Sequence, residues 1–120
     1  MNKRMYVVEV GDIYDESDVY SYVQGMHHTE DDFIDGDLGD RIEKYKRYIV
    51  EDVNISDIQI DEFYIDDDLV EEYKEKILKS NMYPPIVLNK DYSIIDGTHR
   101  INALDDLGYK TVIAFVGVKK

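Results

Sequence analysis

Residues 57–120 are divided into short apolar segments by residues that end regular structure, and this pattern constrains the fold more than any other feature of the chain. Pro84–Pro85 stops any helix that precedes it, because proline lacks an amide hydrogen and restricts the residue before it. Gly97 and Gly108 divide the remainder. From residue 57 onward, the segments predict the order strand, helix, strand, strand, helix, strand.

Each of these elements is predicted by its own spacing. A helix is expected over residues 68–80, where Asp68 and Glu71 resemble a capping box and apolar residues recur at helical intervals. Asn81 and the two prolines should end it. Ile86 to Leu88 and residues 92–95 predict a hairpin, a second helix should lie between Gly97 and Gly108, and residues 111–116 predict a last strand.

The N-terminal half is less regular. Residues 5–10 alternate as a strand would, and residues 40–49 predict a helix because Ile42, Tyr45 and Ile49 share one helical face. Residues 11–39 show no steady period and are expected to form an irregular loop. The chain is therefore interpreted as one α+β domain, 1–120, with a small mixed β-sheet and packed helices. Within it, 1–56 form an acidic extension and 57–120 the core.

Composition excludes several classes of function. The chain has no cysteine, so disulfides, thiolate metal sites and cysteine nucleophiles are excluded. The longest apolar run, residues 112–118, is too short to cross a bilayer, and no signal-like apolar segment follows the N-terminus. These features predict a cytoplasmic protein without a membrane partner.

The charge is strongly negative and unevenly distributed. The formal net charge is −13, from 27 acidic and 14 basic residues. Residues 1–40 carry −9, residues 41–80 carry −5 and residues 81–120 carry +1. Direct binding to a DNA duplex is disfavoured, because such binding depends on basic residues that neutralise phosphates. An anionic ligand is best tolerated in the C-terminal third.

That third contains the most informative motif, Asp96-Gly97-Thr98-His99-Arg100, where an apolar strand passes directly into a helix. The first amides of a helix favour an anion, and Gly97 lets the backbone approach a ligand closely. Thr98 is placed to cap the helix or to bind a phosphate oxygen, and Arg100 offers donors suited to phosphate. Two structural alternatives stay open: Asp96 or Thr98 only caps the helix, and Arg100 only pairs with a carboxylate such as Asp96, since the chain has many.

The motif and its surroundings resemble the core of the ParB/sulfiredoxin superfamily. The resemblance covers about residues 57–116 and rests on residues 85–88, on residues 93–100 and on Ala103-Leu104 with Leu107-Gly108. It implies a ParB/sulfiredoxin-like fold in which the strand–turn–helix holds nucleotide phosphates. ParB proteins bind CTP there, sulfiredoxins bind ATP, and the free serine kinases of the group bind a nucleotide phosphate donor.

Departures from these families restrict what the resemblance implies. Sulfiredoxins have their catalytic cysteine where this chain has Thr98, so repair of sulfinic acids is not expected. ParB proteins follow this core with a helix-turn-helix, which has no counterpart before Lys120, so sequence-specific DNA binding is not expected either. The serine kinases share Asp96, Gly97, His99 and Arg100, but their glutamate base has no identifiable match.

The leading hypothesis is a nucleotide-binding protein that takes CTP, ATP or ADP, with Mg²⁺ as a candidate cofactor, and that works as a weak NTPase or phosphotransferase. Gly97, Thr98, His99 and Arg100 would bind the ligand. Asp96, His99 and Arg100 are the candidate catalytic residues, with Asp96 acting through Mg²⁺ or a hydrogen bond. Positioning and electrostatics dominate phosphoryl transfer, so these residue types suit it.

The alternative hypothesis is an acidic interaction protein, from a phage or mobile element, that imitates DNA and inhibits a host DNA-binding factor without catalysis. Its partner would contact the acidic N-terminal segment, where Tyr14, Tyr20 and Tyr22 are either interface or core residues. Tyr45, Tyr48 and Tyr73 are expected at the edge of the core.

Two acidic clusters could bind a metal ion, but a loop is the preferred interpretation of one and a helix cap that of the other. His27 and His28 precede Glu30, Asp31 and Asp32, a set that suits a divalent metal but is interpreted as a loop. Asp66, Asp67 and Asp68 lie where a helix start favours negative charge, so capping is preferred to Mg²⁺ binding.

Overall fold

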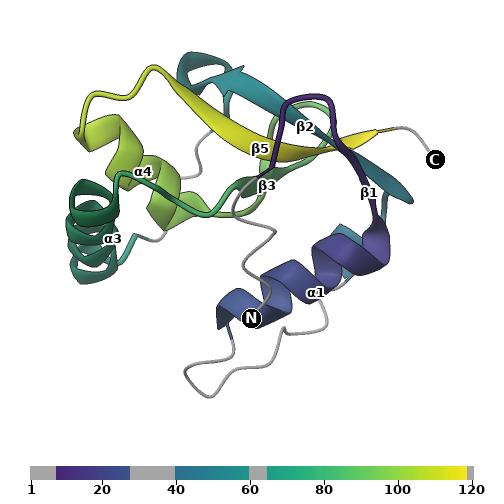
Figure 1. The fold of residues 1–120 in the computed structure, drawn as a ribbon, viewed down its shortest axis with the longest axis horizontal. Coiled ribbons are helices and arrows are strands. Elements are labelled where there is room, and N and C mark those ends of the chain that lie inside the picture. The colour runs from purple at the N-terminus through teal and green to yellow at the C-terminus, as the bar shows by residue number, and fades with distance from the viewer. Residues whose placement is uncertain (1–7, 28–39, 60–64, 119–120) are drawn as a thin grey trace.

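The computed structural model describes residues 8–27, 40–59 and 65–118 (Figure 1). Its elements, in chain order, are β1 (Ile13–Asp15), α1 (Glu16–His27), β2 (Arg47–Asn54), the 3₁₀ turn η2 (Ile55–Asp57), α3 (Asp67–Ser80), β3 (Ile86–Leu88), β4 (Ile94–Asp96), α4 (Thr98–Asp106) and β5 (Thr111–Val118). In these ranges, no helix has the length and apolar character needed to cross a membrane.

The five strands form one mixed sheet in the order β1-β2-β5-β3-β4. The long strands β2 and β5 pair antiparallel along their whole length, from Arg47 with Val118 to Asn54 with Thr111. The short strand β3 runs parallel to β5 and antiparallel to β4. This arrangement confirms the predicted α+β class with a small mixed sheet.

Helices cover both faces of the sheet (Figure 1). Alternate residues of a strand face opposite sides, and in β3 Ile86 and Leu88 pack with residues of α3 and α4 while Val87 packs with residues of α1. The α3/α4 side is largely aliphatic. The α1 side is built around Phe115 and several tyrosines. The start of α4 lies next to β3 and β4, whose side chains belong to the hydrophobic clusters on both faces of the sheet.

The C-terminal elements match the sequence predictions closely. The helix predicted over 68–80 is α3, although its N-cap is Asp66, whose carboxylate accepts hydrogen bonds from the amides of Asp68 and Leu69. Capping is thus confirmed for this acidic cluster. Asn81 ends the helix in the left-handed conformation, and Gly108, at φ 89°, follows α4.

The prediction of a helix over residues 40–49 is wrong. Only residues 40–42 are helical, and Arg47 begins strand β2. Tyr48 and Val50 are both fully buried in the strand's alternating pattern, which the three-residue spacing of Ile42 and Tyr45 obscured. Pairing with the distant β5 stabilises the strand, and such non-local pairing leaves no local signal.

The prediction of an irregular loop over residues 11–39 is also wrong where the chain is described. Residues 13–27 form β1 and α1, and the carboxylate of Asp15 accepts a hydrogen bond of 2.9 Å from the amide of Asp18 at the helix start. Residues 8–10 of the strand predicted over 5–10 are not in a strand, and 5–7 lie outside the described residues. The first core strand, expected from residue 57, begins as the turn η2 and a single bridge at Gln59; residues 60–64 lie outside.

Candidate functional site

The turn between β4 and α4 has a backbone conformation that favours glycine. Gly97 has φ 117° and ψ 19°, in the left-handed region. A Cβ atom at this position would lie 2.5 Å from Cγ2 of Ile86. Both the dihedral angles and the contact with β3 therefore require glycine here, and the turn is packed tightly against the sheet.

The first turn of α4 begins at a residue that cannot cap it with a side chain. Gly97 is its N-cap residue, and the first helical hydrogen bond runs from the amide of Ile101 to the carbonyl of Gly97, at 2.9 Å. The earlier amides of Thr98 and His99 have no acceptor within the helix. Thr98 is the first helical residue and not the N-cap residue, so the alternative in which Thr98 is the N-cap does not hold. The helix start offers donors to a ligand.

A cavity of about 290 Å³ lies at this helix start. It is lined by two residues of α3 and six consecutive residues of the β4–α4 junction: Leu69, Tyr73, Ile95, Asp96, Gly97, Thr98, His99 and Arg100. The structure therefore brings all five residues of the predicted motif to one cavity. Its size is at the lower end of ligand pockets, which suits phosphate groups rather than a whole nucleotide.

His99 is held by the start of α3. Its Nε2 atom accepts a hydrogen bond of 3.1 Å from the amide of Asp66, the residue that caps α3. Accepting this bond requires an unprotonated Nε2, so the neutral ring carries its proton on Nδ1. His99 thereby joins α3 to α4 beside the cavity and keeps one donor.

Arg100 is buried, with 2% of its surface exposed. Its Nη2 atom donates to Oδ2 of Asp96 at 2.7 Å, which forms a buried ion pair. Its Nη1 atom donates to the carbonyls of Pro85 at 2.7 Å and Pro84 at 3.0 Å, and lies 3.4 Å from the hydroxyl of Tyr22. The structure thus shows the pairing with Asp96 that the sequence left open as an alternative.

This environment keeps Arg100 charged. Burial alone would lower the pKa of the guanidinium, but Asp96, Tyr22 and Tyr73 together outweigh this effect, so the pKa is raised above its ordinary value. The guanidinium is directed at Asp96 and at the proline carbonyls. Its role in this geometry is to hold the helix start against β4 and the proline pair.

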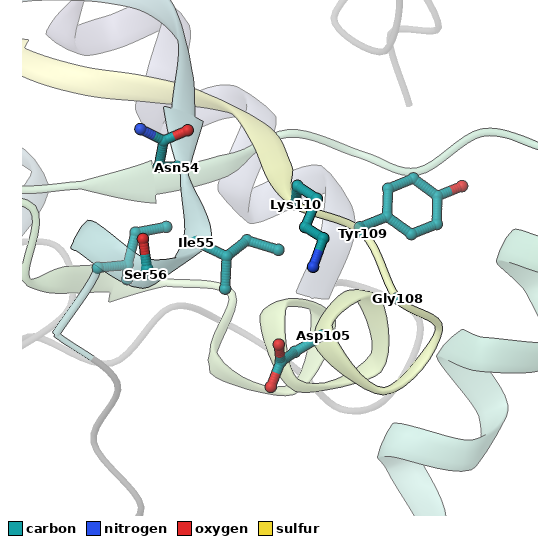
Figure 2. A pocket seen from close by; sticks show the side chains of 8 residues that line it. Asn54, Ile55, Ser56, Asp105, Gly108, Tyr109 and Lys110 are labelled. Carbon is teal, nitrogen blue, oxygen red and sulfur yellow. The ribbon is translucent and has the colours of Figure 1, made fainter.

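A second and larger cavity, of about 610 Å³, lies at the opposite end of α4 (Figure 2). It is bounded by η2, by the last turn of α4 and by the loop between α4 and β5, and Figure 2 shows Asp105 and Lys110 among the side chains that line it. The C-terminal end of a helix carries partial negative charge, so a phosphate is disfavoured there despite Lys110. The two ends of α4 therefore offer opposite electrostatic environments.

The described residues contain no group of three or more histidines and acids placed to hold a metal ion. Asp96, the predicted Mg²⁺ residue, has its carboxylate directed at Arg100, so a cation held by the protein does not fit well at that oxygen. Mg²⁺ that arrives on nucleotide phosphates is compatible with the site. The side chain of His27 and the residues His28, Glu30, Asp31 and Asp32 lie outside the description.

The tyrosines serve the core more than the surface. Tyr45 and Tyr48, which were expected at the edge of the core, are buried within it, and Tyr73 is half-buried beside the cavity. Tyr22, which the sequence left open, is buried with its ring edge-on to Phe115 at 5.1 Å. Tyr14 and Tyr20 are half-buried beside it. The described tyrosines of the acidic segment thus help to pack α1 onto the sheet.

Comparison with known proteins places this geometry in a family. The family model of the ParB N-terminal domain matches residues 40–120, which is more than half of the chain. The chain belongs to the ParB N-terminal domain family. The match includes the whole strand–turn–helix motif and also β2, which the sequence resemblance over 57–116 did not include. No curated protein matches the chain.

Two solved structures share the fold of this ParB N-terminal domain. A Pnob8-like ParB-N domain has a TM-score of 0.50 at 22% identity, over 57% of this chain and 29% of that one. Sulfiredoxin from Arabidopsis thaliana has a TM-score of 0.52 at 20% identity, over 60% of this chain and 86% of that one. The chain therefore matches less than a third of the ParB-N structure's length.

Sequence reasoning on this ParB N-terminal domain missed the residues behind the turn. Pro84–Pro85 was interpreted only as a helix stop, whereas both carbonyls accept from Arg100. The contact of Asp66 with His99 joins residues that are far apart in sequence and has no sequence signal. Tyr22 had a partial signal, because Val19, Tyr22 and Val23 follow Asp15 at helical spacing.

Proposed function

We propose that this ParB N-terminal domain binds a nucleoside di- or triphosphate, with its phosphates at the first turn of α4. The observation that supports this most directly is the cavity of about 290 Å³ at the start of α4, whose N-cap residue Gly97 makes no side-chain hydrogen bond. Helix N-terminal amides favour anions, and the glycine turn lets a ligand approach the backbone. The superfamily resemblance adds CTP, ATP and ADP as the nucleotides to test.

The roles of the motif residues follow from their contacts. The amides of Thr98 and His99 donate to phosphate oxygens, and the Nδ1–H of His99 is a further candidate donor. Arg100 and Asp96 hold the turn from behind. Arg100 contributes to phosphate binding mainly by fixing the amides in place.

A substitution at Thr98 tests the phosphate site without breaking the core. Thr98→Glu places a carboxylate at the first helical position, which favours the helix but repels a phosphate. Thr98→Gln has nearly the same size without the charge. We expect CTP, ATP or ADP, each with and without Mg²⁺, to raise the thermal midpoint of wild type and Thr98→Gln but not of Thr98→Glu.

Two results would count against this proposal. One is a panel in which no nucleotide shifts the wild-type midpoint. The other is an equal shift in Thr98→Glu and wild type, which would place the ligand elsewhere. Inorganic phosphate should give a weaker shift with the same dependence on residue 98.

Turnover is the finer part of the proposal. Asp96 is ion-paired and the Nε2 atom of His99 accepts from Asp66, so the observed contacts favour binding over acid–base catalysis. Phosphate release is measured in wild type, Asp96→Asn and His99→Gln. Release above the background that falls in both variants would add NTPase or phosphotransferase activity to the binding function.

A basic protein partner is a second candidate, favoured by the surface beside β1. The apolar side chains of Val10 and Ile13 are 62% and 63% exposed, with the exposed acids Glu9 and Asp15 close in sequence. Such a surface suits an inhibitor of a DNA-binding factor. Recovery from a lysate of one basic partner that DNA or high salt displaces would favour this function over nucleotide binding.

A further inference from the structure

The buried junction behind the phosphate-binding turn includes a side chain from α1. Tyr22 is 3% exposed, and its hydroxyl donates to the carbonyl of Pro85 at 2.6 Å. The same carbonyl accepts from Nη1 of Arg100 at 2.7 Å. Tyr22 and Arg100, far apart in sequence, therefore share one acceptor at the start of β3.

This junction is continuous with the turn itself. Arg100 lies in the first turn of α4, and its Nη2 atom pairs with Asp96 at the end of β4. The guanidinium also lies directly behind Gly97, because a Cβ atom there would be 3.2 Å from Nη2. A displacement of Pro85 or Arg100 would therefore move the amides that are proposed to bind phosphate.

Helix α1 is an addition to the part of the chain that defines the family. The family match begins at residue 40, whereas α1 spans Glu16–His27. The helix packs on the sheet through Val19, Tyr22 and Val23, and the ring of Tyr22 lies edge-on to Phe115. The hydroxyl of Tyr22 links α1 to the Arg100 junction through hydrogen bonds.

We propose that α1 regulates nucleotide binding at the α4 start, with Tyr22 as the positioning residue that connects them. The inference rests on the proposed function. When α1 is packed on the sheet, Tyr22 fixes Pro85 and Arg100 and so orders the first turn of α4. Because such coupling is reciprocal, a bound nucleotide stabilises the packing of α1 by the same factor.

The matched pair Tyr22→Phe and Tyr48→Phe separates this role from simple packing. Both tyrosines are buried in the α1-side core, and each hydroxyl donates to a backbone carbonyl, that of Pro85 or that of Ile42. Phenylalanine keeps each ring in place. The two variants should lose similar stability, but only the hydroxyl of Tyr22 contacts the junction behind the turn.

We expect Tyr22→Phe to raise the Kd for the nucleotide about three- to tenfold, the range of one lost hydrogen bond. Tyr48→Phe should leave the Kd within about twofold of wild type, since its lost bond is of the same kind but involves neither Pro85 nor Arg100. In wild type, nucleotide should slow hydrogen exchange of the α1 amides around Val19–Val23. That slowing should shrink in Tyr22→Phe and persist in Tyr48→Phe.

A measurement without nucleotide keeps this inference separate from the proposed function. The Ile101 amide closes the first turn of α4 on Gly97, so its exchange rate reports the order of that turn. Tyr22→Phe should accelerate it more than Tyr48→Phe does. Equal effects of the two variants on exchange and on Kd would overturn the inference, whereas a wild type that binds no nucleotide would overturn the proposed function.

Discussion

The starts of α3 and α4 face each other across the candidate site but are built in opposite ways. At α3, the carboxylate of Asp66 accepts from the amides of Asp68 at 3.0 Å and Leu69 at 3.3 Å. At α4, Gly97 has no side chain and the corresponding amides are left to other acceptors. One helix start is neutralised by the protein's own carboxylate, whereas the N-cap residue of the other makes no side-chain hydrogen bond, as the proposed phosphate site requires.

The open start of α4 is more firmly built than the capped one. Gly97 packs against Ile86, and Arg100 is buried behind the turn, whereas Asp66 is exposed. The comparison teaches that structural rigidity and capping are separate properties. A helix start that binds a ligand needs rigidity without capping, because its amide donors must be fixed in place and still be available to the ligand.

Removal of the buried guanidinium behind the start of α4 should cause the largest loss of stability. Arg100→Leu leaves the Asp96 carboxylate without its buried partner, and we expect a loss of about 3–5 kcal/mol in the free energy of unfolding. The half-buried Lys74, which pairs with the exposed carboxylates of Glu71 and Asp106, provides a control, because Lys74→Met should change stability little. Urea denaturation measures both. A loss in Arg100→Leu as small as that in Lys74→Met would contradict a structural role for the junction.

Substitution of the glycines at the two ends of α4 should give the next largest difference in the free energy of unfolding. Gly97→Ala combines left-handed strain with overlap on Ile86, so we expect a loss of about 2–4 kcal/mol. Gly108 also has a positive φ, but a Cβ atom there would meet no other atom within 4 Å, so Gly108→Ala should lose about 1 kcal/mol. Equal losses in the two variants would show that the start of α4 is no more tightly packed than its end.

The capped helix start gives a smaller effect. Asp66→Ala removes the two capping hydrogen bonds of α3, and we expect a loss of about 1 kcal/mol. Asp66→Asn should recover most of it, because the amide oxygen can still accept. Thermal denaturation of the three proteins checks this order. A variant with alanine as stable as wild type would indicate that α3 is held by packing alone.

Local patterns in the sequence predicted most of the C-terminal half. Pro84, Gly97 and Gly108 mark boundaries by their own backbone restrictions, so the elements between them could be assigned without tertiary information. The α+β class followed from those elements. The passage from a strand directly into a helix at Gly97 was also predicted correctly, and such a junction exposes the first amides of the helix in any context.

The remainder depends on contacts between distant residues. Strand β2 is stabilised by β5, so its segment was misread as a helix. The role of Arg100 could not be chosen from sequence, because its partners Pro85 and Tyr22 are brought to it only by the fold. Helix α1 was missed because the acids that begin it were interpreted as part of a charged loop, although Asp15 is its cap.

The start of α1 is also capped by a carboxylate, that of Asp15. Substitution of Asp15 should give the smallest change in stability, and its pH dependence tests how much the charge of the cap contributes. Hydrogen bonds from the amide of Asp18 and the hydroxyl of Ser17 lower the pKa of Asp15 below its ordinary value. A carboxyl with a lowered folded pKa stabilises the protein above its unfolded pKa, and that contribution is lost as the pH falls through the folded one. Asp15→Asn should therefore be less stable than wild type at pH 7, with a difference that narrows below about pH 4.

The control for this prediction is Glu72→Gln, which removes one negative charge from an exposed position on α3. Because the chain carries a net charge of −13, the loss of any carboxylate relieves some repulsion, and the control corrects for that term. Thermal midpoints of the three proteins are compared at pH 7, 5 and 3. A corrected difference between wild type and Asp15→Asn that stays constant over this range would mean that the cap acts by hydrogen bonding alone, and that its charge contributes nothing to the start of α1.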